Sequence, residues 1–333
     1  MTVNSLNRVR IKLFLFTLLS IALISGCTTP SVLVANTPDP KPERTRLEAI
    51  PASAIKITPE TDAHPPQLHS DKYKKPVPLN SAINTAGGED SAFIMPDGNT
   101  LYYWFTPDVT VPPEKQLIDG VTDIYVSRNQ GNTWGAAQRL VLRDKNELSL
   151  DGCLFVRTDE MWFCSARKGN FRGMDMWIAE FNDLRWTNWR NAGNKLNVDY
   201  EVGELHITAD GKDMYFHSAR PGGKGQYDIW VTRYENGEWH EPENVEAVNT
   251  PDTDGWPFVT QDGNELWFTR TYMGTPAIFV SKKAEGHWSK PELILSQFAG
   301  EPSLDNNGNI YFTHHFFKDG KMIEADIYVA YRK

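Results

Sequence analysis

The chain places a carboxylate at or next to the start of each of five short apolar segments. These acids are Glu89 with Asp90, Asp151, Glu204, Asp254 and Glu301. If the five segments meet at one point, the acids repel one another, which raises their pKa values and suits them to general acid–base chemistry. The same acids could instead accept hydrogen bonds from backbone amides, hold water or bind a cation.

Other residues with chemical potential form weaker patterns. Trp104 and Trp256 lie near the same ends of these segments and could stack on a sugar ring. The eight histidines have no metal-ligand spacing, because His314 and His315 are neighbours on an expected strand and point to opposite faces. The sequence has no Ser–His–Asp arrangement and no glycine-rich phosphate loop. We therefore expect no cofactor, and the sequence leaves open whether a metal or another cation binds among the acids.

A repeat must position these residues. The patterns DIYV, DMWI, DIWV and DIYV begin at Asp123, Asp175, Asp228 and Asp326, and AIFV at Ala277 is a fifth member. Successive members are 52, 53, 49 and 49 residues apart. Each follows two alternating apolar runs joined by a tight turn, as in IMPDGNTLYYW and ITADGKDMYF, which is a strong hairpin signal. Each unit therefore predicts four short strands.

Four strands in each repeat predict a blade of a β-propeller. We expect an all-β fold, a five-bladed β-propeller of four-stranded blades over residues 71–333. The last unit ends without a fourth strand, and residues 73–85 (YKKPVPLNSAINT) echo residues 239–250 (WHEPENVEAVNT). An N-terminal strand is therefore expected to complete the last blade and remove the free edges. A β-sandwich with evenly spaced strands is the alternative.

Residues 72–333 resemble the bacterial WD-like β-propeller repeats of periplasmic and outer-membrane proteins. The resemblance is clearest in FHSARPGGKGQYDIWVTRYENGEWHEPENVEAVNT, residues 216–250, and in SARKGNFRGMDMWI of the preceding repeat. It implies ion pairs within blades, Arg167 with Asp175 and Arg220 with Asp228. This resemblance predicts the fold but not the function, because propellers host many activities.

A five-bladed propeller with Asp, Asp and Glu at its channel mouth also resembles the furanosidase group of glycoside hydrolases. This resemblance implies that Asp90 is the base that activates water, that Asp151 orients and tunes, and that Glu204 is the general acid. A base–acid separation of about 6.5–9.5 Å would imply inversion of configuration. The expected binding residues at the same mouth are Glu301, Asp254, Trp104 and Trp256.

The first 26 residues predict a lipoprotein signal peptide. Basic residues precede a 12-residue apolar run, residues 13–24, which is too short to span a bilayer. The run ends in Ile-Ser-Gly-Cys, which resembles a lipobox and makes Cys27 the expected lipidation site. Residues 27–70 contain eight prolines and no aromatic residue, which predicts a disordered tether. Thr28 favours the outer membrane, so we expect a lipid-anchored protein that faces the periplasm.

Cys153 and Cys164 lie on the two strands of one expected hairpin, around the turn at Thr158-Asp159. With a two-residue turn, residue 157 pairs with residue 160 and Cys153 faces Cys164. A register slip would place the two cysteines diagonally. In an oxidising compartment they could form a disulfide, and two buried free thiols are the alternative.

Charge and hydropathy exclude several classes of function. With 34 Lys and Arg against 43 Asp and Glu, the net charge of -9 argues against nucleic-acid binding. The mean hydropathy of -0.48 excludes a protein with several membrane spans. We expect a monomeric recognition module that binds an envelope protein or a glycan at the channel mouth. The alternatives are a glycoside hydrolase and a structural partner that docks through the propeller rim.

Overall fold

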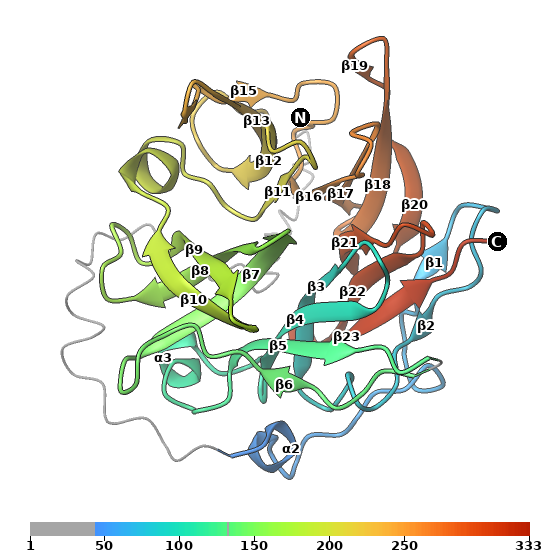
Figure 1. The fold of residues 1–333 in the computed structure, drawn as a ribbon. Helices are drawn as coiled ribbons and strands as arrows, with labels where there is room; N and C mark the ends of the chain where they lie inside the picture. Colours follow the sequence, from blue (N-terminus) through green and yellow to red (C-terminus); the bar gives the residue numbers. More distant parts are fainter. Residues whose placement is uncertain (1–43, 132) are drawn as a thin grey trace, which may run out of the picture.

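The computed structural model describes residues 44–131 and 133–333, and the predicted leader and Cys27 lie outside these residues (Figure 1). The described part is nearly all β. Its helices are α2 (Arg46–Ala49), α3 (Pro113–Gln116) and the π-helix η1 (Lys195–Asp199). Within the described ranges, no helix is both long and apolar enough to cross a membrane.

The strands form four sheets, and we describe them as runs of antiparallel strands, called groups, in which consecutive strands are neighbours. The eight-stranded sheet contains two of these groups. Group one contains β3 (Gly88–Ile94), β4 (Thr100–Thr106), β5 (Asp123–Arg128) and β6 (Gln138–Arg139), and group two contains β7 (Ser149–Arg157), β8 (Glu160–Arg167), β9 (Asp175–Asn182) and β10 (Arg185–Asn191). Group three contains β11 (Leu205–Ile207), β12 (Asp213–Ser218), β13 (Asp228–Glu235) and β15 (Glu243–Asn244), with β14 (Glu238–Trp239) paired to β13.

Group four contains β16 (Asp254–Val259), β17 (Glu265–Tyr272), β18 (Thr275–Ala284) and β20 (Glu292–Ser296), with β19 (His287–Trp288) paired to β18. Group five contains β21 (Ala299–Leu304), β22 (Ile310–Lys318), β23 (Lys321–Ala330) and β2 (Val77–Pro78). A single parallel pairing, Ala325 with Gly88, joins groups five and one into an eight-stranded sheet.

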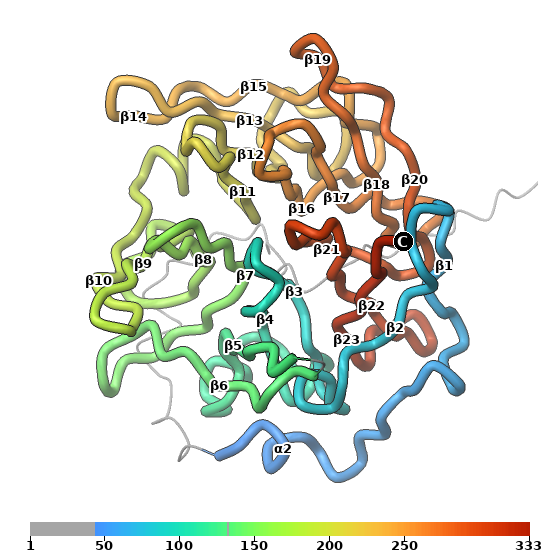
Figure 2. Tube along the Cα trace, turned by 45° about the vertical axis from the view of Figure 1, so that its right-hand side comes forward, coloured from blue at the N-terminus to red at the C-terminus, as the bar shows by residue number. Residues whose placement is uncertain are grey.

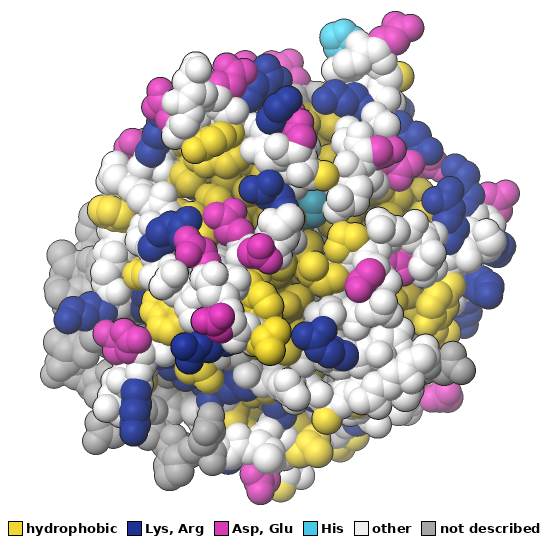
Figure 3. Space-filling model, viewed as in Figure 1, with side chains coloured by type: hydrophobic (Ala, Val, Ile, Leu, Met, Phe, Trp, Pro, Cys, Tyr) yellow, Lys and Arg dark blue, Asp and Glu magenta, His cyan; other side chains and the backbone are white. Residues whose placement is uncertain are grey.

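The groups are arranged around a common axis (Figures 1 and 2). The first strand of each group, β3, β7, β11, β16 and β21, lies nearest the axis, and each contacts the next in cyclic order. This is the arrangement of a β-propeller. On the face in Figure 3, hydrophobic side chains gather near the centre, and charged side chains of both signs are interspersed around them.

The N-terminal strand β2 pairs with β23, the third strand of the last group. Val77 is opposite Val329 and Pro78 is opposite Tyr328, and an isolated bridge joins Tyr73 to Arg332. The strand that precedes the first repeat therefore supplies the outer strand that the last repeat lacks, as the sequence echo predicts.

A β-bulge changes the predicted hairpin register in the inner strands. In the second group, Arg157 pairs with Glu160 as predicted, but the register shifts between Gly152 and Phe155. Gly152, and not Cys153, therefore lies opposite Cys164. Cys153 and Cys164 form a disulfide from these positions. β3, β16 and β21 shift at the corresponding place.

Residues 44–70 pack against the propeller, which differs from the predicted tether. Arg46 forms an ion pair with the buried Glu89 at 3.2 Å. Lys56 reaches Glu324 and Asp326, and β1 (Gln67–Leu68) pairs with β20. The composition of the segment indicates disorder because it lacks aromatic residues, but cations and backbone pairing hold it in place.

The ion pairs implied by the repeat resemblance are not the pairs that form. Arg167 binds Asp151 at 2.6 Å instead of Asp175, and Arg220 binds Glu241 instead of Asp228. Asp175 and Asp228 accept hydrogen bonds from backbone N–H groups of the loops that precede them. The repeated aspartates therefore shape the loops, and the arginines hold the starts of inner strands or an exposed loop.

Candidate functional site

Five side chains, four from equivalent points of the inner strands and one directly before β11, surround the centre of the channel. They are Ser91, Cys153, Glu204, Trp256 and Glu301, and all five line one cavity of about 40 Å³. Four of them have positive φ: Ser91, Cys153, Trp256 and Glu301. Bulges of this kind redirect side chains, and strained backbone of this kind is found at functional sites. We call these five residues the channel ring.

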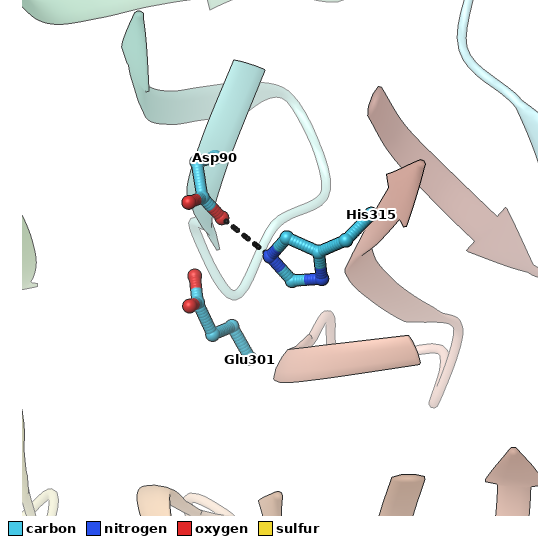
Figure 4. A group of neighbouring side chains, drawn as sticks. All are labelled: Asp90, Glu301 and His315. Carbon is cyan, nitrogen blue, oxygen red and sulfur yellow. Dashed lines mark ion pairs between the residues drawn. The ribbon is translucent and has the colours of Figure 1, made fainter. Parts of the chain in front are cut away.

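Asp90 and His315 form a compact cluster with Glu301 of the channel ring (Figure 4). One oxygen or nitrogen atom from each residue lies within 4.8 Å of the other two. The backbone N–H of Ser91 donates to Asp90 Oδ1 at 2.9 Å and to Glu301 Oε2 at 2.8 Å. His315 Nε2 lies 3.5 Å from Asp90 Oδ1. The three side chains are buried.

The acids of this region have different pKa values because their surroundings differ. Burial acts to raise the pKa of Asp90, but the adjacent His315 ring and the Ser91 N–H lower it to about 2. Burial and the charge of Asp90 raise the pKa of Glu204 to about 8, although Trp256 Nε1–H donates to Glu204 Oε1 at 3.0 Å. Burial and the same charge raise the pKa of Glu301 well above its ordinary value. Near neutral pH the site therefore holds an ionised Asp90 beside a neutral Glu204, and Glu301 holds its proton more tightly than a free carboxyl group does.

Three of the predicted channel acids belong neither to this cluster nor to the channel ring. Glu89, Asp151 and Asp254 precede the channel ring by two residues on their strands and form structural ion pairs. Asp151 is held by Arg167 and by the hydroxyls of Ser149 and Ser165. Asp254 is held by Arg270 and Thr250.

The expected roles of Asp151 and Asp254 at the channel mouth therefore need correction. Asp151 lines a cavity of about 20 Å³ together with Asp90, but its oxygens are occupied by Arg167 and serine partners. The physical reason is the bulge, which the alignment of repeats on their turns does not reveal. It inserts a residue between the repeated acids and the positions that face the channel.

The predicted tryptophans lie at the site but are not open stacking platforms. Trp104 is 6% exposed, and its indole ring lies against Gly152, where an added Cβ would come within 3.0 Å of the ring. Trp256 is 4% exposed and uses its N–H on Glu204. A sugar ring could reach neither indole face in this conformation.

Aromatic side chains fill the channel next to the ring. Phe93, Phe155, His206 and Phe258 form this plug, with ring centroids 5.5 Å apart for Phe93–Phe155, 4.5 Å for Phe155–His206 and 4.4 Å for His206–Phe258. Burial lowers the pKa of His206 to about 3, so the imidazole is neutral in the plug. The plug separates the ring from a cavity of about 180 Å³ at the other end of the channel.

A small pocket opens where the loop after β8 meets the segment before β11 and the loop after β12. It has a volume of about 90 Å³ and contacts Glu204 of the channel ring. Arg172, Met174, Glu201 and Tyr227 are among the residues that line it. We call this cavity the mouth pocket, because it connects the ring with exposed side chains of these loops.

Sequence reasoning missed the histidines of the site. His315 is in the acid cluster, and His217 lines the mouth pocket, where burial lowers its pKa to about 4. His314, which precedes His315 in the sequence, points away from the cluster, and its Nε2 lies 2.9 Å from Asp62 Oδ2. The sequence gives one signal for these histidines: in the last repeat, two histidines stand where the other repeats have different residues.

Comparisons with known proteins give only distant similarities. No protein-family model matches the chain, and no curated protein matches it. An endo-arabinase from Bacteroides thetaiotaomicron has 15% identity and a TM-score of 0.48, over 77% of this chain and 96% of that chain. An alpha-L-arabinofuranosidase from Lactobacillus brevis has 13% identity and a TM-score of 0.46, over 75% and 92%. TolB from Acinetobacter baumannii has 14% identity and a TM-score of 0.42, over 75% and 56%. Similarities this distant assign no activity to the chain.

Proposed function

We propose that the protein is a recognition module that binds an envelope protein through the mouth pocket. The observation that carries this proposal is the small size of the cavities around the acids, about 20, 40 and 90 Å³. Pockets that enclose small ligands measure about 300–1,000 Å³. A cavity of 90 Å³ suits one inserted side chain of a protein better than a sugar ring, so a protein partner is favoured over a glycan.

The proposal includes five blades and a lipid anchor. Counting the eight-stranded sheet as two blades gives five, and the cyclic contacts of the inner strands support this count. Lipidation at Cys27 would tether the propeller to the outer membrane on its periplasmic side. Labelling cells with a radioactive fatty acid tests the anchor: the chain should be labelled, and a Cys27→Ser variant should not. Equal labelling of the two would exclude Cys27.

Photo-crosslinking in cells tests the binding surface. A photoreactive amino acid replaces Met174, which lines the mouth pocket, and in a control it replaces Leu184, which is 90% exposed in the β9–β10 turn. The proposal expects a discrete crosslinked species from position 174 and none from position 184. Crosslinking only from position 184, or from neither position, would contradict it.

A glycoside hydrolase is the second candidate, favoured by the opposite pKa shifts of two carboxyl groups. Asp90 is ionised and Glu204 is neutral near pH 7, which fits a base and a general acid. Glu301, and not Asp151, would be the third acid. Hydrolysis of chromogenic furanosides and pyranosides by the full chain and its Glu204→Gln variant tests this candidate. Turnover by the wild type that is lost in the variant would support it, and no turnover on any substrate would count against it.

A further inference from the structure

Three atoms that carry lone pairs point at one another in the Asp90–Glu301–His315 cluster. The carboxylate oxygens of Asp90 and Glu301 and a ring nitrogen of His315 lie within 4.8 Å of one another. The Ser91 N–H donates to each carboxylate from the side. His315 Nε2 is buried and has no hydrogen-bond partner among the described residues.

The contact made by the other ring nitrogen of His315, Nδ1, limits the protonation states that the ring can adopt. His315 Nδ1 lies 3.3 Å from the carbonyl oxygen of Phe298. A carbonyl oxygen only accepts hydrogen bonds, so Nδ1 carries a hydrogen, and Nε2 faces Asp90 with either a second proton or a lone pair that can bind a metal ion. Nε2 and the carboxylate oxygen of Asp90 lie 3.5 Å apart, so the pair is stable only with a positive charge between the two atoms, either a proton or a metal ion.

We propose that Asp90, Glu301 and His315 bind one divalent transition-metal ion of the Zn²⁺ type. One imidazole nitrogen with two carboxylates is a donor set for such metals, whereas Ca²⁺ prefers six to eight oxygen ligands. Histidine ligands of metals usually donate their second N–H to a backbone carbonyl or a carboxylate, as Nδ1 does here toward Phe298.

The distance between His315 and Asp90 and the space around the cluster fit such an ion. Two ligand atoms bound tetrahedrally at about 2.1 Å lie about 3.4 Å apart, and His315 Nε2 and Asp90 Oδ1 are 3.5 Å apart. Cavities of about 20 Å³ beside Asp90 and 40 Å³ beside Glu301 have room for a water ligand.

The site would join the two ends of the repeat array. Asp90 belongs to β3 in the first group, and Glu301 and His315 belong to β21 and β22 in the last group. A bound ion would therefore crosslink the groups that the single pairing of Ala325 with Gly88 connects. This inference does not depend on the proposed partner protein, because metal binding is measured without a partner.

Zinc titration of the full chain in detergent, after treatment with a chelator, tests the site. Competition with a chromophoric chelator should give one Zn²⁺ per chain, and Zn²⁺ should raise the Tm. Asp90→Asn and His315→Gln should each weaken binding by about 100-fold and remove the Tm increase, and Ca²⁺ should not replace Zn²⁺. His287→Gln, at an exposed histidine in β19, is the matched control and should bind as the wild type does.

A spectroscopic measurement tests the site in a third variant whose folding is checked separately, in case the first two variants fold poorly. Glu301→Gln keeps the size of the side chain, and near-UV circular dichroism reports whether it folds. The Co²⁺-loaded wild type should show d–d absorption bands that change in Glu301→Gln. Zinc binding that persists unchanged in Asp90→Asn and His315→Gln would overturn the proposal. Absence of any stoichiometric zinc binding by the wild type would also overturn it, and a shared proton would then explain the cluster.

Discussion

Replacing Arg46 by alanine tests whether residues 44–70 are part of the folded domain. The Arg46 side chain is 11% exposed and its partner Glu89 is fully buried, with 3.2 Å between Nη1 and Oε1. The same guanidinium donates to the carbonyl oxygens of Ile83 at 3.0 Å and Ala82 at 2.7 Å, and it lies over three aromatic rings. Removing one partner of a buried ion pair costs about 3–5 kcal/mol.

The cost should depend on pH because Glu89 titrates. Burial raises the pKa of Glu89 to about 7 even though Arg46 and Thr85 lower it. A carboxyl group with a raised folded-state pKa stabilises the fold fully below its unfolded-state pKa, near 4.5, and loses this contribution as pH rises toward 7. Without Arg46 the pKa rises further, so the loss continues above pH 7 at about 1.4 kcal/mol per pH unit.

Urea unfolding of the full chain at pH 5 and pH 8 measures both effects. Arg46→Ala should lower the free energy of unfolding by about 3–5 kcal/mol at pH 8. At pH 5, where Glu89 is neutral, the decrease should be about 1–3 kcal/mol, from the two lost carbonyl partners. Arg233→Ala is the control, because Arg233 is 65% exposed beside Asp213 and should cost about 0–1 kcal/mol. An Arg46→Ala cost equal to that of the control at both pH values would show that the contact between Arg46 and Glu89 does not stabilise the fold.

Three further predictions concern the ring and its surroundings. Replacing both Cys153 and Cys164 by alanine should lower the free energy of unfolding by about 3 kcal/mol and leave the crosslink from position 174 intact. Loss of the crosslink in a folded variant would contradict a purely structural role for the disulfide. Phe155→Ala should cost about 3–5 kcal/mol in urea unfolding because it empties part of the aromatic plug, and a cost below about 1 kcal/mol would show that the plug is loosely packed. Asp151→Asn should lower the free energy of unfolding by about 3–5 kcal/mol because it leaves Arg167 buried without its charge partner, and it should leave the zinc affinity unchanged. A large loss of zinc affinity would place Asp151 in the site.

The repeat made most of the fold predictable from the sequence. The interval between DIYV-type patterns and the Asp-Gly turns located the strands of each group, and the echo of residues 239–250 in residues 73–85 located the N-terminal strand of the last group. Both signals are local or periodic, so they can be recognised without knowledge of side-chain contacts.

The candidate site was predicted only in part, because its geometry depends on bulges and long-range contacts. Glu204 and Glu301 were found because they stand at the channel positions themselves. Asp151 and Asp254 look equivalent in an alignment on the turns, but the bulge separates their positions from the ring. Arg46 pairs with Glu89, 43 positions away in sequence, and His315 faces Asp90 of the first group, and no local pattern reports such contacts.

The most direct test of recognition through the mouth pocket is to fill that pocket and follow the crosslink from position 174. Ala219→Trp puts a large side chain at an exposed position of the pocket. Ala209→Trp, at the opposite cavity of the channel, is the matched control. Ala219→Trp should abolish the crosslinked species, and Ala209→Trp should preserve it. A crosslink that survives Ala219→Trp in a folded chain would contradict the proposed function.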